Sequence, residues 1–151
     1  MLKVGDEAPS FSGNSQGGVF VNSEEYIGKK VILFFYPKDN TPGCTAEACD
    51  LRDNISLLKK EGFEIVGVSA DSVLRHEKFA DKFSLPYPLI ADEDKTVIKA
   101  YGIWGPKKFM GKEYEGIHRK TFIIDEEGNI EKIIEKVKTK AHAEQILATY
   151  K

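Results

Sequence analysis

Apolar residues along the chain alternate between continuous β-prone runs and stripes at helical spacing. Residues 31–36 are apolar on both faces, a pattern typical of strands that helices cover on each side. Residues 64–70 predict a second buried strand. The residues between these runs that stay within about 40° of one helix face are Cys44, Ala48, Leu51, Ile55 and Leu58. A strand, a helix and a second strand in this order predict parallel pairing through a right-handed crossover.

The second half of the chain continues this pattern and then changes it. Asp71 or Ser72 is expected to cap a helix, and a third strand follows at residues 89–91. The elements expected after it are a short helix from Asp92 to Tyr101, a β-hairpin of residues 119–125 and 130–137, and a last helix with Ala143, Ile146, Leu147 and Tyr150 on its apolar face. The whole resembles the thioredoxin fold: an α/β chain with a central mixed sheet flanked by helices, preceded by an N-terminal extension with a small hairpin or an edge elaboration.

Residues 103–118 form a long connection between two expected elements. The connection contains Trp104, Phe109, Met110 and Tyr114 among three glycines, which is too aromatic for a simple linker. We therefore expect an ordered Ω-type loop that lies over a pocket.

The composition narrows the range of functions. With 151 residues, 41% apolar and 30% charged, the chain has the length and balance of one soluble globular domain, which we expect to span residues 1–151. A net charge of −2 without long blocks of like charge gives no reason to expect nucleic acid or a membrane surface as partner. The first residues lack a secretory-signal pattern, and no apolar segment could span a bilayer, so we expect a cytoplasmic protein.

Both cysteines lie where the first core strand passes into the following helix. Pro37 ends the strand, and Thr41 followed by proline is expected to cap the helix. Cys44 then lies in the first helical turn, where unpaired N–H groups and the helix dipole stabilise a thiolate. In a reducing compartment two cysteines are more often a working pair than a permanent structural disulfide. The junction therefore predicts thiol chemistry.

The spacing of the two cysteines has a geometric consequence. Residues five apart in an α-helix are separated by about 8.6 Å, more than the ~7 Å that a disulfide can bridge without backbone movement. A disulfide between Cys44 and Cys49 would therefore require the first helical turn to open. Cys49 falls outside the apolar stripe and is expected to be the more accessible thiol.

The junction resembles a known family. Residues 37–44, PKDNTPGC, match the peroxiredoxin pattern P-x-x-x-T/S-x-x-C, and the C-x4-C continuation resembles the bacterioferritin-comigratory, or Q, subfamily. Similarity extends to residues 5–9, 41–53, 104–112 and 116–125, and thus to nearly the whole chain. The resemblance implies a thiol peroxidase that acts on hydrogen peroxide or organic hydroperoxides, is reduced by thioredoxin or a thioredoxin-like protein, uses no metal or organic cofactor, and is a monomer.

The resemblance also implies roles for individual residues. Cys44 corresponds to the peroxidatic cysteine, which becomes a sulfenic acid, and Cys49 to the resolving cysteine, which closes an intramolecular disulfide. Thr41 and Arg119 correspond to the groups beside thiolate and peroxide, and Pro37 to the residue that shields the pocket. Gly43, with its free N–H group, is expected to help bind the substrate. Whether Glu47, one turn after Gly43, contributes is left open by the sequence.

Several alternatives remain at this stage. A zinc module that used both cysteines and histidines would lack any familiar ligand spacing, and His76, His118 and His142 are expected to be surface or hydrogen-bonded structural residues. A thiol–disulfide oxidoreductase shares the expected fold, but its attacking cysteine normally sits in C-x-x-C. A peroxide sensor would show the same oxidation without turnover.

Overall fold

The structure is a computed structural model that describes residues 1–151. Its strands are β1 Ser12–Asn14, β2 Phe20–Asn22, β3 Lys30–Phe35, β4 Phe63–Ser69, β5 Leu89–Ala91, β6 Trp104–Phe109, β7 Lys112–Ile117, β8 Lys120–Ile124 and β9 Ile130–Ile134. Its α-helices are α1 Pro42–Asp53, α2 Ile55–Lys60, α3 Val73–Phe83, α4 Thr96–Ala100 and α5 His142–Ala148. Two short 3-10 turns, Gln16–Gly18 and Ser23–Tyr26, lie in the N-terminal segment.

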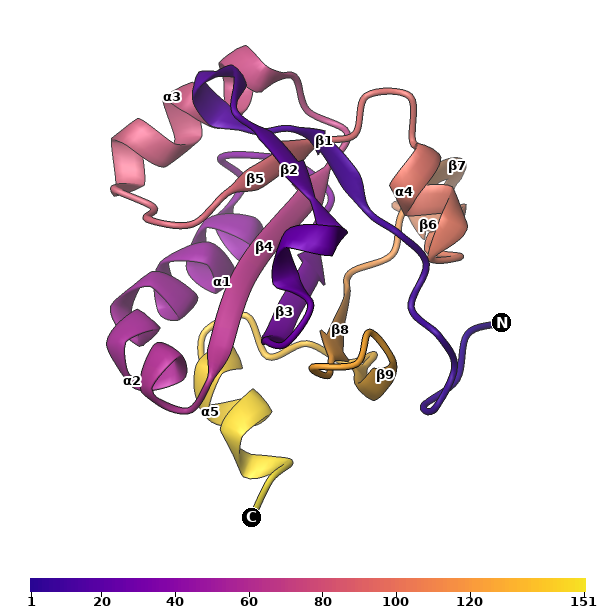
Figure 1. The fold of residues 1–151 in the computed structure, drawn as a ribbon. Helices are drawn as coiled ribbons and strands as arrows, with labels where there is room; N and C mark the ends of the chain where they lie inside the picture. The colour runs from indigo at the N-terminus through magenta and orange to yellow at the C-terminus, as the bar shows by residue number, and fades with distance from the viewer.

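A five-stranded mixed sheet forms the centre of the molecule (Figure 1). Its strand order is β5-β4-β3-β8-β9, with β3 in the middle. Strand β4 pairs in parallel with both β3 and β5, whereas β3–β8 and β8–β9 are antiparallel. The predicted crossover topology and the predicted C-terminal hairpin are both confirmed. The carboxyl end of the central strand β3 thus leads directly into α1.

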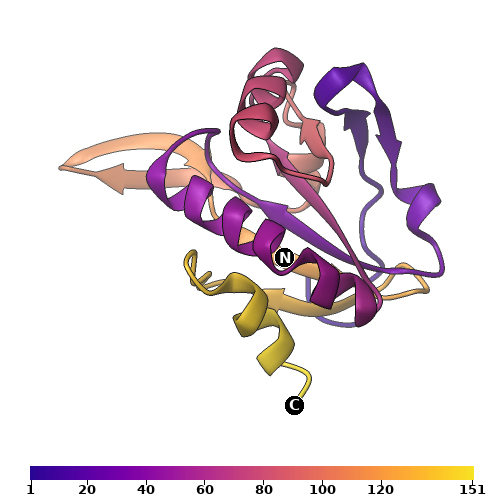
Figure 2. The same ribbon diagram turned by 90° about the vertical axis from the view of Figure 1, so that its left-hand side faces the viewer.

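The sheet has an apolar layer on each face because its strands are buried on both sides. Ile32 and Phe34 of β3 point into one core together with the apolar faces of α1, α2, α3 and α5, whereas Val31, Leu33 and Phe35 point into the other, which α4 and the N-terminal segment cover. Figure 2 shows α1 and α5 side by side on the first face. This alternation is the physical reason why residues 31–36 are apolar at every position.

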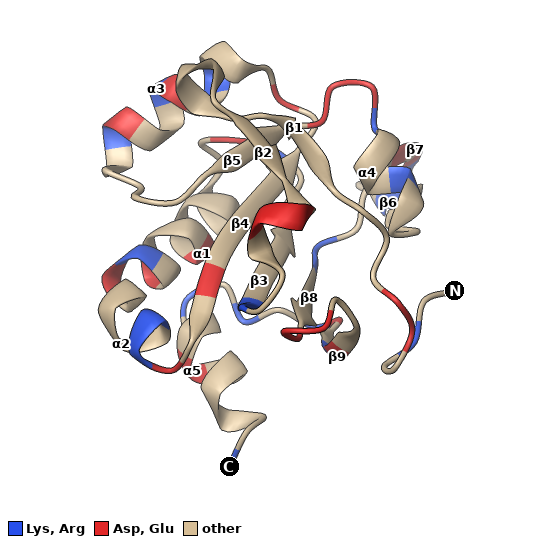
Figure 3. Ribbon diagram, viewed as in Figure 1, with Lys and Arg blue, Asp and Glu red and all other residues tan.

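The N-terminal segment forms the expected small hairpin, in which β1 and β2 pair antiparallel. Basic and acidic residues are interspersed over the elements of the ribbon (Figure 3). None of the helices combines the length and the apolar character that crossing a membrane requires.

The prediction of an Ω-type loop over residues 103–118 is wrong. Strands β6 and β7 form an antiparallel hairpin that extends away from the central sheet (Figure 2). Met110 and Gly111 form its two-residue turn with φ of 52° and 82°, the left-handed pair that suits a tight hairpin. Phe109 and Met110 at its tip are exposed. The usual Asn-Gly signal is absent here, which is why the sequence did not indicate a hairpin.

Several element boundaries also differ from the prediction, among them the start of α4, which lies at Thr96 and not at Asp92. The helix that starts at Pro42 breaks at Asn54, so Leu58 reaches the same core from the separate helix α2. Strand β9 ends at Ile134 and not at residue 137. Tyr150 lies beyond α5, where its ring packs edge-on against Phe63 and takes no part in the helix face.

Candidate active site

Cys44 lies in the first turn of α1 and faces the core. Pro42 is the first helical residue, and the first backbone hydrogen bond of the turn runs from the Thr45 N–H to the Thr41 carbonyl. The Cys44 side chain is only 2% exposed and belongs to the apolar cluster under α1. The predicted position of Cys44, in the first helical turn and on the apolar face of the helix, is therefore confirmed.

Arg119 joins Cys44 to a second acidic group. Its guanidinium donates from Nη2 to Cys44 Sγ over 3.2 Å and from Nη1 to Glu47 Oε1 over 2.6 Å. Although burial lowers the pKa of Arg119, the charges of Cys44 and Glu47 outweigh it, and the pKa lies above its ordinary value. Arg119 reaches the site because it precedes β8, whose Lys120 is paired with Phe35 at the carboxyl end of β3.

Gly43 provides the space for this guanidinium. A Cβ atom at Gly43 would lie 3.3 Å from Arg119 Nη2, closer than most real side-chain contacts. The glycine in the motif therefore lets the arginine approach the sulfur from the side of the helix N-terminus.

Glu47 is part of the same arrangement, which the sequence had left undecided. It lies three residues after Cys44 on the buried face of α1 and is fully buried. Burial raises the pKa of its carboxyl from 4.5 to about 7, and the adjacent Arg119 opposes that rise. The i, i+3 spacing from Cys44 is the sequence signal that places both side chains on one helix face.

Thr41 occupies the N-cap position, but its side chain does not cap the helix as predicted. Its hydroxyl donates to the Lys38 carbonyl over 2.9 Å and makes no cap hydrogen bond. It makes no hydrogen bond to Cys44 either. The hydroxyl proton is thus committed to the loop, and the oxygen remains able to accept a hydrogen bond. Pro37, at the other end of this loop, is half-buried.

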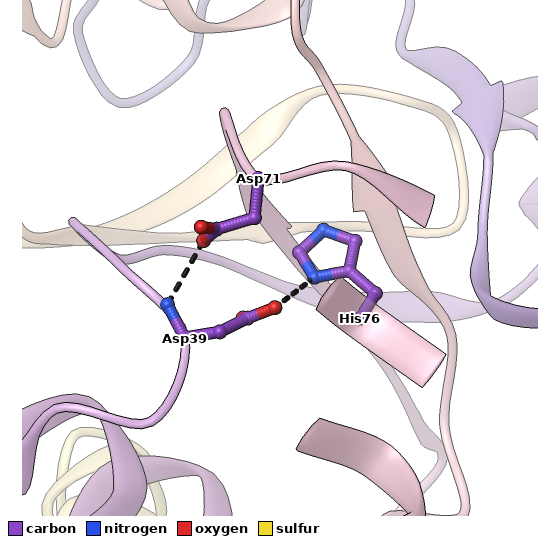
Figure 4. A group of neighbouring side chains, drawn as sticks. All are labelled: Asp39, Asp71 and His76. Atoms are coloured by element: carbon purple, nitrogen blue, oxygen red, sulfur yellow. Dashed lines mark hydrogen bonds and ion pairs between the residues drawn. The ribbon is translucent and has the colours of Figure 1, made fainter. Parts of the chain in front are cut away.

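A buried polar cluster fixes the loop between Pro37 and Thr41. Asp39 accepts a hydrogen bond from the Tyr36 hydroxyl over 2.6 Å, and its other oxygen lies 2.6 Å from His76 Nδ1. The backbone N–H of Asp39 donates to Asp71 over 2.9 Å, and Figure 4 shows Asp39 between Asp71 and His76. His76 Nε2 lies 3.0 Å from the Ile90 carbonyl.

The same three side chains offer donor atoms within 4.8 Å of one another, as a metal site would require. Asp71 Oδ2 already accepts from Asp39 N–H and Ser69 Oγ, and its Oδ1 pairs with Arg75. The His76 and Asp39 atoms are likewise engaged with each other. These contacts favour a scaffold that holds the loop before Cys44, a role that the sequence did not indicate for Asp39.

Cys49 lies one turn further along α1 and is half-buried, so it is the more accessible thiol, as predicted. Burial raises the pKa of the Cys49 thiol, Arg52 opposes the rise and Asp53 adds to it. Both cysteines are free and α1 is continuous between them.

The base of the β6–β7 hairpin adjoins the site. Lys107 of β6 donates to the Ile117 carbonyl over 2.8 Å. Burial, and then the neighbouring Arg119, lower the pKa of this lysine, while Cys44 opposes them. A second basic group near the sulfur, besides the Arg119 guanidinium, was not predicted from the sequence, because the hairpin itself was not.

Comparisons with known proteins agree with this geometry. The AhpC/TSA family model matches residues 4–133. Peroxiredoxin Bcp of Escherichia coli (strain K12) is 47% identical over 146 residues, 97% of this chain and 94% of that protein. Peroxiredoxin Bcp of Bacillus subtilis (strain 168) is 43% identical over 150 residues, 99% of this chain and 96% of that protein. The bacterioferritin comigratory protein of Xanthomonas campestris, studied for alkyl peroxide reduction, superposes with a TM-score of 0.85 at 34% identity, covering 92% and 88% of the two chains. The predicted thioredoxin-like fold is thereby confirmed, and the chain belongs to the AhpC/TSA family as a peroxidase of the Bcp, or Q, group of peroxiredoxins.

Proposed function

We propose that this peroxidase works through Cys44 and Cys49 in sequence. The Cys44 thiolate attacks one oxygen of the peroxide, so that an S–O bond forms, the O–O bond breaks, and water or an alcohol leaves after taking up a proton. Cys49 then attacks the resulting sulfenic acid, a disulfide forms, and water is released. The observation that carries the proposal is the hydrogen bond of 3.2 Å from Arg119 to the buried Cys44 Sγ.

Groups around the sulfur support the first step. Negative charge moves from sulfur to the leaving oxygen during the reaction, and Arg119 is placed to stabilise it. The N–H groups of Gly43 and Cys44 precede the first intrahelical donor, Thr45, and so remain free for a peroxide oxygen. The Thr41 oxygen can accept the peroxide proton, and Pro37 shields the pocket from bulk water.

The second step needs a change of shape. Cys49 is half-buried and one turn away from the buried Cys44, beyond disulfide reach while the helix is intact. We propose that the first turn of α1 unwinds after oxidation and exposes the sulfenic acid to Cys49. A disulfide exposed in this way suits reduction by thioredoxin or a similar dithiol protein in the cytoplasm.

Hydrogen peroxide and organic hydroperoxides are the proposed substrates. The Xanthomonas campestris relative is an alkyl peroxide reductase by its description, and this chain aligns with it over most of its length. A single chain holds all the proposed groups, so the mechanism requires no second copy.

Steady-state peroxide consumption with a thioredoxin system tests the proposal. Wild type should turn over, Cys44→Ser should be inactive, and Cys49→Ser should lose thioredoxin-driven turnover while it still reacts once with peroxide. Full activity of Cys44→Ser would refute the mechanism, and full activity of Cys49→Ser would refute only the resolving role. Oxidation of wild type without turnover would instead indicate a sensor.

A further inference from the structure

One oxygen of the site has no hydrogen-bond partner. Glu47 Oε1 accepts from Arg119, but Glu47 Oε2 is the one buried side-chain nitrogen or oxygen atom without a hydrogen bond. His142 Nε2 of α5 lies 3.5 Å from this oxygen, and both side chains are fully buried. A carboxylate oxygen without a donor in the interior is costly, so the protonation of this pair needs an explanation.

The hydrogen bonds of His142 determine where its own proton lies. Its Nδ1 faces Gln145 Oε1 at 3.0 Å. The Gln145 amide is oriented by two backbone groups, because Oε1 accepts from Lys138 N–H and Nε2 donates to the Lys136 carbonyl. Oε1 is therefore an acceptor, and Nδ1 must carry the proton of the neutral ring. Nε2 of neutral His142 is then an acceptor too, and takes the Thr121 hydroxyl at 2.7 Å.

An ionised Glu47 would thus face a nitrogen lone pair and no donor. A proton on Oε2 removes the negative charge that would face this lone pair. Burial lowers the pKa of His142, whereas burial raises that of Glu47 to about 7, so the proton belongs on Glu47 when the ring is neutral. A thiolate at Cys44, on the other side of the same guanidinium, disfavours a second negative charge further.

The other charged or titratable groups around the pair do not supply a donor to Glu47 Oε2. Asp50 is an acid that accepts from the Ala143 N–H over 2.8 Å. The Tyr87 hydroxyl is committed to the Ala48 carbonyl over 2.7 Å. Lys107 is bonded to the Ile117 carbonyl. Arg119 is therefore the single cation in hydrogen-bond contact with two acids, Cys44 and Glu47.

We propose that Glu47 carries a proton on Oε2, the oxygen that faces His142, while Cys44 is a thiolate, and that Glu47 loses this proton when Cys44 becomes a sulfenic acid. The inference rests on the proposed role of Cys44 and deepens it. The positive charge of Arg119 is then paired with one anion at a time. This anion is the Cys44 thiolate before the reaction and the Glu47 carboxylate after it. His142 is a positioning residue that keeps the unprotonated nitrogen next to Oε2.

The reaction balances with Glu47 included. The thiolate, the protonated Glu47 and one hydroperoxide yield the sulfenic acid, the Glu47 carboxylate and one alcohol or water. Sulfur loses two electrons, the peroxide accepts them as its O–O bond breaks, and the leaving oxygen gains one proton. The proton that Glu47 releases matches the one that the leaving oxygen takes up, with solvent as the medium of exchange.

Proton counting during a single turnover tests this inference. The proteins are Cys49→Ser and Cys49→Ser with Glu47→Gln, each treated with one equivalent of hydrogen peroxide in weakly buffered indicator solution between about pH 6 and 9. The glutamine variant, which has no proton to give, should take up about one proton per sulfenic acid wherever Cys44 is a thiolate. Cys49→Ser, which keeps Glu47, should take up at least about half a proton less per sulfenic acid than the glutamine variant over a range of pH that begins at about 7.

The outcomes separate the inference from the proposed function. Equal proton uptake by the two proteins, whether near zero or near one, overturns the inference, although sulfenic acid formation by mass would still support Cys44 as the reacting thiol. Absence of sulfenic acid in Cys49→Ser refutes the proposed function itself. Exposed Glu144 on α5 provides the matched control, because Glu144→Gln makes the same chemical change and should leave the proton count of Cys49→Ser unchanged.

A second readout does not depend on how well the glutamine variant folds. Infrared difference spectra of Cys49→Ser before and after oxidation should lose the C=O band of a protonated carboxyl and gain carboxylate bands. A difference spectrum without loss of that band overturns the inference.

Discussion

Oxidation of Cys44 and Cys49 to a disulfide should lower the stability of this protein, although disulfides usually raise it. Closing a loop of about six residues removes denatured-state entropy worth roughly 2 kcal/mol in the chain-entropy model. The disulfide destabilises the native state by more than this. Opening one turn of α1 breaks about four backbone hydrogen bonds at ~1 kcal/mol each, and it disturbs the Tyr87 hydroxyl bond to the Ala48 carbonyl of 2.7 Å. The net effect is a loss of about 2–3 kcal/mol.

Urea unfolding of the reduced and oxidised forms measures this difference. The oxidised form should also melt lower by roughly 4–12 °C, given the 2–4 °C per kcal/mol typical of a chain of this size. Hydrogen exchange should show the amides of residues 44–50 protected in the reduced protein and exposed after oxidation. An oxidised protein that is as stable as the reduced one, or that keeps this turn protected, would refute the reasoning on the helix.

Three further perturbations follow from the site. The pKa of Glu47 is raised from 4.5 to about 7 in the folded state, so its contribution to stability is present below about pH 4.5 and is lost as pH rises toward 7. The free energy of unfolding measured in urea should therefore fall by an amount on the order of 3 kcal/mol over this range. Glu47→Gln should abolish this decline, whereas exposed Glu144→Gln should retain it. Asp39→Ala leaves two buried polar partners unsatisfied, so it should cost about 3 kcal/mol and slow peroxide reduction, unlike exposed Asp81→Ala; equal behaviour of the two would contradict the scaffold role. Arg119→Met should lower kcat/KM for peroxide roughly 10- to 100-fold in stopped-flow assays, the equivalent of one charge-assisted hydrogen bond, with partial rescue by lysine; an unchanged rate would remove Arg119 from the reaction.

The features that could be predicted from the sequence are those that a local pattern determines. Residues 31–36 are apolar throughout because both faces of the sheet are covered. This run and the second β-prone run at residues 64–70 indicated the central parallel pair. The Thr41-Pro42 start placed Cys44 in a helical first turn, and the helical period placed it in the core.

The features that could not be predicted depend on contacts between distant segments. Glu47 and Arg119 are 72 positions apart, and only the β3–β8 pairing brings them together. Asp39 and His76 are 37 positions apart and likewise meet only in the folded chain. Thr41 was expected to cap α1, but the Lys38 carbonyl competes for its hydroxyl within the same loop. The hairpin over residues 104–117 was missed because its Met-Gly turn lacks the usual turn signal.

The central claim is that Cys44 reacts with peroxide first and Cys49 second. One equivalent of hydrogen peroxide added without reductant, followed by peptide mass mapping, tests it most directly. Wild type should yield a Cys44–Cys49 disulfide, Cys49→Ser a sulfenic acid at Cys44, and Cys44→Ser no oxidised cysteine on the same time scale. Oxidation of Cys49 in Cys44→Ser at the wild-type rate would contradict the account.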